Sequence, residues 1–212
     1  FIRYWFFAIP VMAYMNCTQK ASVPGPAETC LTRFTEYTNK PDTLHNFIAE
    51  LPAGNPLSDT LLKTVLDSVQ FESLHFGTGQ PRFWALGKFT LEDDVRGCIV
   101  QTEEHWFGKQ SLLIFDLKRQ RCTSVMELSH FYGGDGGQTA SESWLFLNTR
   151  PPRLFVKTAE HGLVPPQNDT DEPREYLHES GRLFRWKNTE FDPVPNPDSV
   201  LFLQRFQMHR SW

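Results

Sequence analysis

Short apolar segments separated by tight polar turns fill most of the chain after residue 82, and this feature restricts its fold more than any other. Four such segments come first: 83–91, 95–106, 110–117 and 122–131. Within LLIFDL and SVMELS, apolar and polar residues partly alternate, which is the period of a half-buried β-strand. Because sequences such as KRQR interrupt the segments, the pattern predicts four consecutive antiparallel strands, a meander.

The same texture returns after a glycine-rich stretch at 132–143. The second set of segments is 144–149, 153–162, 174–180 and 183–191, and a last strand is predicted at 199–209. Two meanders predict a mostly β fold with two antiparallel sheets, arranged like propeller blades or like a sandwich. Since two blades cannot close a ring, we expect the sheets to pack face to face.

Two segments before the strands carry apolar residues at helical spacing. Residues 41–52 and 57–69 are the best candidates for helices, and Ser58 is a suitable N-cap for the second. The sequence therefore predicts one or two short N-terminal helices that cover part of the β structure.

The composition excludes several classes of function. The chain has 212 residues with 18 Phe and 6 Trp, enough for a substantial core, and its net charge of −4 comes without a basic stripe. A nucleic-acid partner is therefore not expected. The chain contains no G-x-S-x-G, H-E-x-x-H or phosphate-loop sequence and no Cys-x-x-Cys pair, so no metal site and no cofactor are predicted. Catalytic triads are assembled in space, so an enzyme is not excluded.

The start of the chain has the order of a secretory signal. Arg3 precedes a charge-free run over 4–16, which is too short to span a bilayer, and the run ends at Cys17. A cysteine directly after an apolar run resembles the lipobox of bacterial lipoproteins, so Cys17 is the predicted lipidation site. A plain signal cleaved near Ala13 and a buried strand are the alternatives. The predicted organisation is a signal-like segment 1–16, a polar tether 17–29 and one β-rich domain 30–212.

A family resemblance follows from these features taken together. The lipobox-like cysteine, the tether, a short segment with ELP, the meanders and the strand LFRWKNTEF at 183–191 resemble small uncharacterised bacterial cell-envelope lipoproteins. The resemblance implies a cell-envelope location, attachment to the membrane through a lipid anchor and a mostly antiparallel β fold. It implies no activity.

Two internal cysteines lie in predicted strands. A bridge between Cys98 and Cys122 would close a loop of about 25 residues and stabilise the fold by roughly 3 kcal/mol. The alternative is that both are buried thiols.

The candidate ligand-binding residues lie in and near the glycine-rich stretch. Tyr132 and Asp135 belong to HFYGGDGG, whose glycines free the backbone, and Trp106 stands beside a predicted turn where an aromatic ring can meet a sugar or a protein. The leading hypothesis is an exported binding module whose partner is an unknown envelope protein or glycan. The alternatives are an envelope hydrolase with a site between the two sheets, and a structural or assembly subunit.

Overall fold

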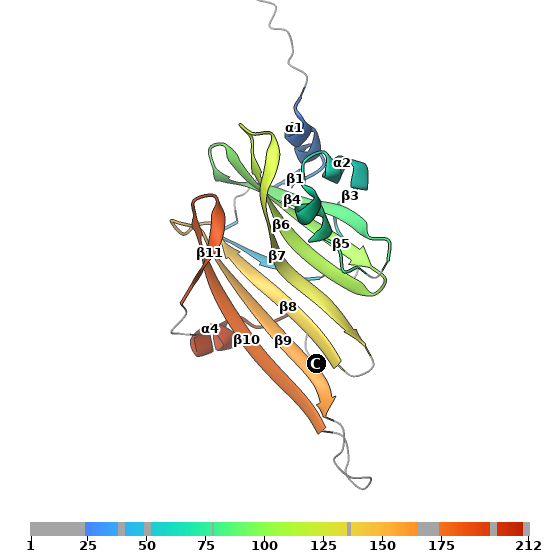
Figure 1. Ribbon diagram of the computed structural model, residues 1–212. Helices are drawn as coiled ribbons and strands as arrows, with labels where there is room; N and C mark the ends of the chain where they lie inside the picture. Colours follow the sequence, from blue (N-terminus) through green and yellow to red (C-terminus); the bar gives the residue numbers. More distant parts are fainter. Residues whose placement is uncertain are drawn as a thin grey trace, which may run out of the picture.

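The structure is a computed structural model that describes residues 24–37, 41–48, 52–77, 79–134, 137–164, 174–195 and 199–209. These residues form a mostly β fold in which all eleven strands belong to one mixed sheet (Figure 1). The strands are β1 Thr35–Glu36, β2 Thr43–Asn46, β3 Asn55–Leu57, β4 Arg82–Glu92, β5 Val95–Glu104, β6 Phe107–Asp116, β7 Arg121–Gly134, β8 Gly137–Phe146, β9 Arg153–Val164, β10 Arg174–Lys187 and β11 Glu190–Val194. The helices are α1 Pro26–Leu31, α2 Asp59–Lys63, α3 Ser68–Glu72 and α4 Ser199–Arg205.

The sheet is open and runs in the order β1-β4-β5-β6-β7-β8-β9-β10-β11. It forks between β7 and β8. These strands pair with each other only from His130 to Gly134 on the β7 side, whereas the far part of β8, Ser143–Phe146, pairs with β2. The fork separates a β4–β7 half from a β8–β11 half, and this separation allows the two halves to face each other.

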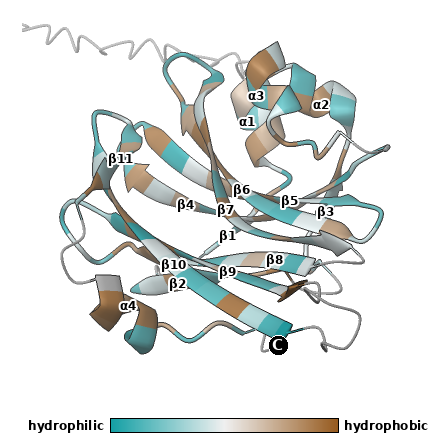
Figure 2. Cartoon of the chain, turned by 60° about the horizontal axis from the view of Figure 1, so that its bottom comes forward, coloured by the Kyte–Doolittle hydropathy of each residue, from teal (hydrophilic) through white to brown (hydrophobic). Residues whose placement is uncertain are grey.

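Two apolar clusters fill the space on either side of the β4–β7 half. The first lies under helices α1–α3 and includes Cys98, Leu113 and Phe115. The second draws on both halves of the sheet and consists of Phe89, Val95, Ile99, Leu112, Ile114, Leu128, Leu145, Leu147, Leu154, Trp186 and Phe191. Figure 2 shows α1–α3 on the outer side of the β4–β7 half and α4 against the outer side of the other half. The β4–β7 half is therefore buried on both faces.

Local sequence signals explain the short helices. The Ser58 side chain accepts a hydrogen bond from the Leu61 N–H, which confirms its predicted role as the N-cap of α2. Asp67 and Gln70 form a reciprocal capping box that starts α3 five residues after α2 ends. The predicted helix over 57–69 is thus two short helices.

Several predictions made from local pattern are wrong. The sandwich or propeller of two separate sheets is replaced by one forked sheet, because the glycine-rich stretch continues β7 and β8 as a hairpin. The segment 41–52 contains β2 and not a helix over Thr43–Asn46, and 199–209 contains α4 and not a strand. The domain boundaries stay a prediction; helix α1 spans residue 30, where the domain was predicted to begin, and its Ala27 is fully buried.

The three cysteines in the described part of the chain, Cys30, Cys98 and Cys122, are all free and buried. Cys98 lies on β5 and Cys122 on β7, with β6 between them. Two strand spacings place their Cα atoms roughly 10 Å apart, beyond the limit of about 7 Å for a disulfide. The bridge considered between them does not fit this sheet. Cys17 lies outside the described residues.

Candidate binding surface at the end of the sheet

Strands β8, β9 and β10 extend past the rest of the sheet and form an arm (Figure 1). The register across the arm is continuous: Tyr132 on β7 faces Thr139 on β8, which faces Glu160 on β9, which faces His178 on β10. Directly opposed residues project from the same face of a sheet, and so do residues two apart on a strand. Tyr132 and Tyr176 therefore share one face of the arm.

Glycines form the floor between these two tyrosines. Gly134, Gly137 and Gly162 face one another across β7, β8 and β9, and Gly162 faces Tyr176 on β10. A Cβ added to Gly162 would lie 2.7 Å from Cε1 of Tyr176, so the tyrosine ring lies directly over this glycine. The glycine-rich sequence thus leaves a strip without side chains beside an exposed ring.

Trp106 completes the surface from the side of β7. It stands in the tight turn between β5 and β6, next to His105, whose φ of 57° lies in the left-handed region. Its indole Nε1 donates a hydrogen bond of 3.1 Å to the carbonyl of Gly133, beyond the last residue of β7 that pairs with β6. This bond fixes the ring at the hairpin while 69% of the residue stays exposed.

We call Trp106, Tyr132 and Tyr176 the aromatic surface. Tyr132 is 42% exposed and Tyr176 45% exposed. Two of these residues, Trp106 and Tyr132, were predicted from the sequence, and the structure brings them to neighbouring positions on the β7–β8 hairpin. Asp135 lies outside the described residues, so its predicted role stays a prediction. Tyr176 was missed because a Tyr-Leu pair in a predicted strand is ordinarily part of a core.

A polar cluster supports Tyr132 from one side. The His130 ring lies 4.8 Å from the Tyr132 ring, and its Nδ1 lies 2.6 Å from Oε1 of Glu127 and 3.0 Å from Oγ of Ser141. Burial acts to raise the pKa of Glu127, but the hydrogen bond and charge of His130 and the charge of Lys109 outweigh it, so the pKa is lowered. The carboxylate therefore stays ionised and holds the imidazole in place beside the tyrosine.

This cluster contains serine, histidine and glutamate, but it lacks the geometry of a catalytic triad. In a triad the carboxylate and the nucleophile contact different ring nitrogens. Here both Glu127 and Ser141 contact Nδ1, and Nε2 of His130 is buried with no hydrogen-bond partner in the described part of the chain. The arrangement orients a side chain and does not prepare a nucleophile.

A second histidine–carboxylate pair lies on the other face of β8. Nε2 of His45 is 2.7 Å from Oε2 of Glu142, which also accepts a hydrogen bond from the His209 backbone N–H. The His45 ring stacks on Trp144 with centroids 4.5 Å apart. These contacts connect β2 and the segment after α4 to β8, which is a structural role.

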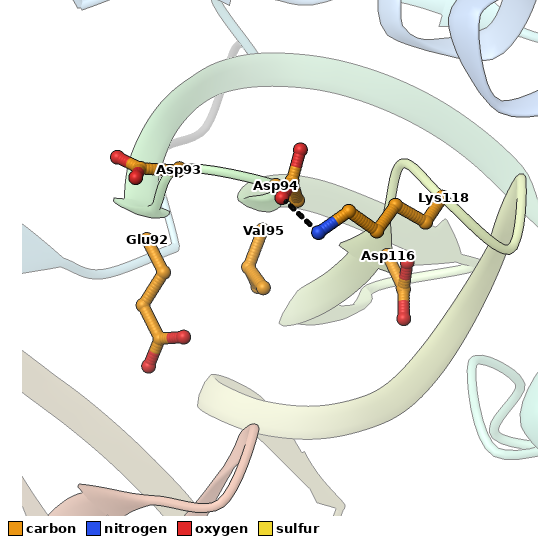
Figure 3. Close-up of a pocket in the computed structure, with 6 residues that line it drawn as sticks. All are labelled: Glu92, Asp93, Asp94, Val95, Asp116 and Lys118. Carbon is orange, nitrogen blue, oxygen red and sulfur yellow. Dashed lines mark ion pairs between the residues drawn. The ribbon is translucent and has the colours of Figure 1, made fainter.

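Two described cavities lie elsewhere. One, of about 570 Å³, is lined by Glu92, Asp93, Asp94, Val95, Asp116 and Lys118, and Figure 3 shows Lys118 reaching across to Asp94. The other, of about 480 Å³, lies between the α2–α3 connection and the start of β7 and includes Arg119 and Arg121. Neither is lined by a histidine, so neither coincides with a histidine–carboxylate pair.

The described residues contain no group of three or more His, Cys, Asp or Glu side chains arranged to hold a metal ion. Among the same residues, no helix is both long enough and apolar enough to cross a bilayer. No protein family, characterised protein or solved structure compared with this chain matches it. Its function is therefore argued from its own residues.

Proposed function

We propose that the protein is an exported, lipid-anchored binding module of a bacterial cell envelope and that it holds a partner protein on the aromatic surface. One observation carries the binding role: three large aromatic side chains are exposed at one end of the sheet, and the ring of Trp106 is fixed there by its hydrogen bond to Gly133. The location rests on the signal-like run before Cys17 and on the family resemblance.

Rings held in place before binding favour tight association. Tyrosine and tryptophan bury large areas with few rotatable bonds, and such residues dominate the binding free energy of protein interfaces. Because Trp106 is hydrogen bonded and the Tyr132 ring packs at a tilt against His130, little side-chain entropy remains to be lost at these two residues. The glycine strip between Tyr132 and Tyr176 lets a partner approach the backbone closely.

Binding is favoured over hydrolysis because the two histidine–carboxylate pairs lie apart from each other and from the described cavities. The His130 cluster lacks a nucleophile at Nε2, the His45 pair stacks on an aromatic ring, and the described cavities have no histidine.

Site-specific photo-crosslinking tests the aromatic surface. The full-length protein is produced in its native envelope with p-benzoylphenylalanine at position 106, 132 or 176, and with the same group at Val69 and Leu201 as controls. Those control residues are 77% and 64% exposed on helices α3 and α4. We expect a discrete protein adduct from the three surface positions and none from the controls.

Each other outcome has a defined meaning. The aromatic surface would be excluded as the site if Val69 gave as much adduct as the three surface positions. It would also be excluded if none of those three positions gave an adduct. An adduct removed by glycan-cleaving enzymes but not by protease would make the partner a glycan, and an adduct of twice the chain mass would favour assembly. Mass spectrometry of the mature N-terminus in the same preparation tests the anchor, and an unmodified Cys17 would remove it.

A further inference from the structure

The outer edge of β10 is unpaired over most of its length. On its inner side β10 pairs with β9 without interruption from Arg174 to Arg185. On its outer side β11 pairs only with Leu183–Lys187. Among the described residues, no strand lies beside Arg174–Arg182, and the first seven residues of β10 are exposed. The backbone N–H and C=O groups of alternate residues therefore point outward from this edge.

The two terminal strands of the sheet are short or blocked. At one end, β1 has two residues and pairs with the middle of β4. At the other end, β11 has five residues and contains Pro193, which cannot donate a backbone hydrogen bond. Proteins protect exposed edges with prolines, bulges or charged side chains. Arg174–Arg182 has no proline, and its register with β9 has no bulge, so its four charged side chains are the features that select what can pair with it.

The charges along this edge are arranged by face. Arg174, His178 and Arg182 follow one another at intervals of four residues along β10. Residues an even number of positions apart share a face of the sheet, so all three project from the same face as Tyr176. None of the three forms an ion pair among the described side chains, and the acidic residue directly opposite on this face is Glu160, which faces His178. On the opposite face, Glu175 lies 3.8 Å from His161 and Glu179 lies 2.8 Å from Lys157, so those charges are already compensated.

This charge pattern disfavours a second copy of the chain as the occupant. Two β10 edges related by a two-fold axis through His178 would place Arg174 opposite Arg182 of the other copy. The neighbouring symmetric register, centred on Leu177, would place Glu175 opposite Glu179. Like charges directly opposite each other destabilise a strand pair. A strand with acidic side chains at every fourth position would face Arg174, His178 and Arg182.

We propose that the outer edge of β10, Arg174–Arg182, binds an extended acidic segment of a partner protein as an additional antiparallel strand. The backbone of the segment continues the sheet, and its acidic side chains face Arg174, His178 and Arg182. Apolar side chains of the segment cover Tyr176 on one face and Leu177 on the other, which are 45% and 54% exposed. This strand addition rests on the proposed function only in requiring that the partner be a protein.

Synthetic peptides test the site directly. The peptide ETTTEVVTE places glutamates opposite Arg174, His178 and Arg182 and valines opposite Tyr176 and Leu177. The matched control is KTTTKVVTK. Binding of fluorescent peptides to the full-length protein in detergent is followed by anisotropy. We expect the acidic peptide to bind about tenfold more tightly than the lysine peptide, and this difference to shrink as salt is added.

Charge reversal and backbone methylation make the test specific. The R174E/R182E variant should reverse the preference between the two peptides, whereas K63E/R121E, with the same change in net charge on exposed residues elsewhere, should keep it. Two acidic peptides N-methylated on alternate residues, one set for each edge of the strand, should differ: one set blocks pairing with β10 and the other leaves binding intact.

Three results would overturn the strand addition. The first is equal binding of the acidic and lysine peptides, and the second is equal loss with both methylated peptides. The third is a concentration-dependent dimer in sedimentation that R182E strengthens, as expected if Arg174 lies opposite residue 182 of a second copy. Photo-crosslinking at the aromatic surface together with any of these results would leave the proposed function standing and remove only the strand addition. Peptide binding that meets the expectations, without crosslinks at the aromatic surface, would support the edge site alone.

Discussion

Strands β6 and β10 belong to one sheet, yet their surroundings are opposite. Eight consecutive residues of β6, from Gly108 to Phe115, are buried, because β5 and β7 flank it and an apolar cluster lies on each face. The first seven residues of β10 are exposed and one of its edges is open. The β4–β7 half therefore supplies stability, whereas the arm is held mainly by backbone pairing and leaves its side chains free for other uses.

The sequences of the two strands reflect this difference. The run LLIF in β6 is apolar at consecutive positions, as expected of a strand buried on both faces. The sequence REYLHES in β10 mixes charged and aromatic residues on both faces. Exposed aromatic residues on a strand that the core does not need are a recognisable sign of an interaction surface.

The largest expected effect comes from truncating the same residue type in both regions. Leu113→Ala on β6 should lower the free energy of unfolding by about 3 kcal/mol, because Leu113 is fully buried and its removal leaves a cavity. Leu177→Ala on β10 should change it by less than about 0.5 kcal/mol. Urea denaturation of both variants measures the difference, and similar losses would show that the arm is part of the cooperative core.

A smaller effect is expected where the arm holds α4. Nζ of Lys157, a buried residue, donates to the carbonyls of Leu203 and Phe206 at 3.1 and 3.4 Å and lies 2.8 Å from Glu179. Lys157→Ala leaves those carbonyls unpaired, so we expect a loss of about 2–3 kcal/mol. Hydrogen exchange should show this loss mainly in α4. The matched control is Lys187→Ala on the neighbouring strand β10, whose side chain is exposed; an equal loss there would contradict the role of Lys157.

The smallest expected effect per side chain is a loss of stability at alkaline pH, and it concerns only the thiols buried in and against the β4–β7 half. Burial raises the pKa of Cys30 to about 11 and that of Cys122 to about 12, and burial with the neighbouring Cys30 raises the pKa of Cys98 well above its usual value. A thiol with a raised folded pKa contributes stability below its unfolded pKa of about 8.5 and loses it as pH rises toward the folded value. Stability should therefore fall from about pH 8.5 upward, by roughly 2 kcal/mol per thiol at pH 10.

Urea midpoints at pH 8 and pH 10 measure this loss. Cys30→Ala should reduce the fall by about a third, because one of three thiols is removed. Tyr37, whose pKa is also raised by burial, acts in the same direction, and Tyr37→Phe separates its share. A fall that is unchanged when all three cysteines are replaced would show that the thiols are not responsible.

Parts of the fold followed from local pattern. The meander β4–β7 lies where alternation and turn residues predicted it, and KRQR forms the β6–β7 turn with Gln120 at a φ of 53°. The β5–β6 turn was misplaced by two residues: it lies at His105 and Trp106, not at the Phe-Gly-Lys that follows. Trp106 is still at that turn, so its predicted exposure is confirmed.

Other parts depended on contacts between distant residues. Gly181 was predicted to form a turn, but β10 continues through it, because a side chain there would lie 2.8 Å from the Phe155 ring and would also meet Leu203 of α4. Phe202 and Phe206 are four residues apart and both pack on Phe155, which stabilises 199–209 as a helix although its apolar run resembles a strand. Neither contact can be predicted from the sequence around Gly181 or from residues 199–209 alone, because both involve Phe155 on another strand.

The sequence by itself determined that the chain is mostly β and where most of its strands and turns lie, because the alternation of apolar residues and the turn chemistry act within a few residues. Only the tertiary structure decided that the strands form one forked sheet, and that Tyr132, Trp106 and Tyr176 are all exposed toward its end. Those outcomes depend on which strand pairs with which and which face is covered, and these are set by packing between segments far apart in the chain.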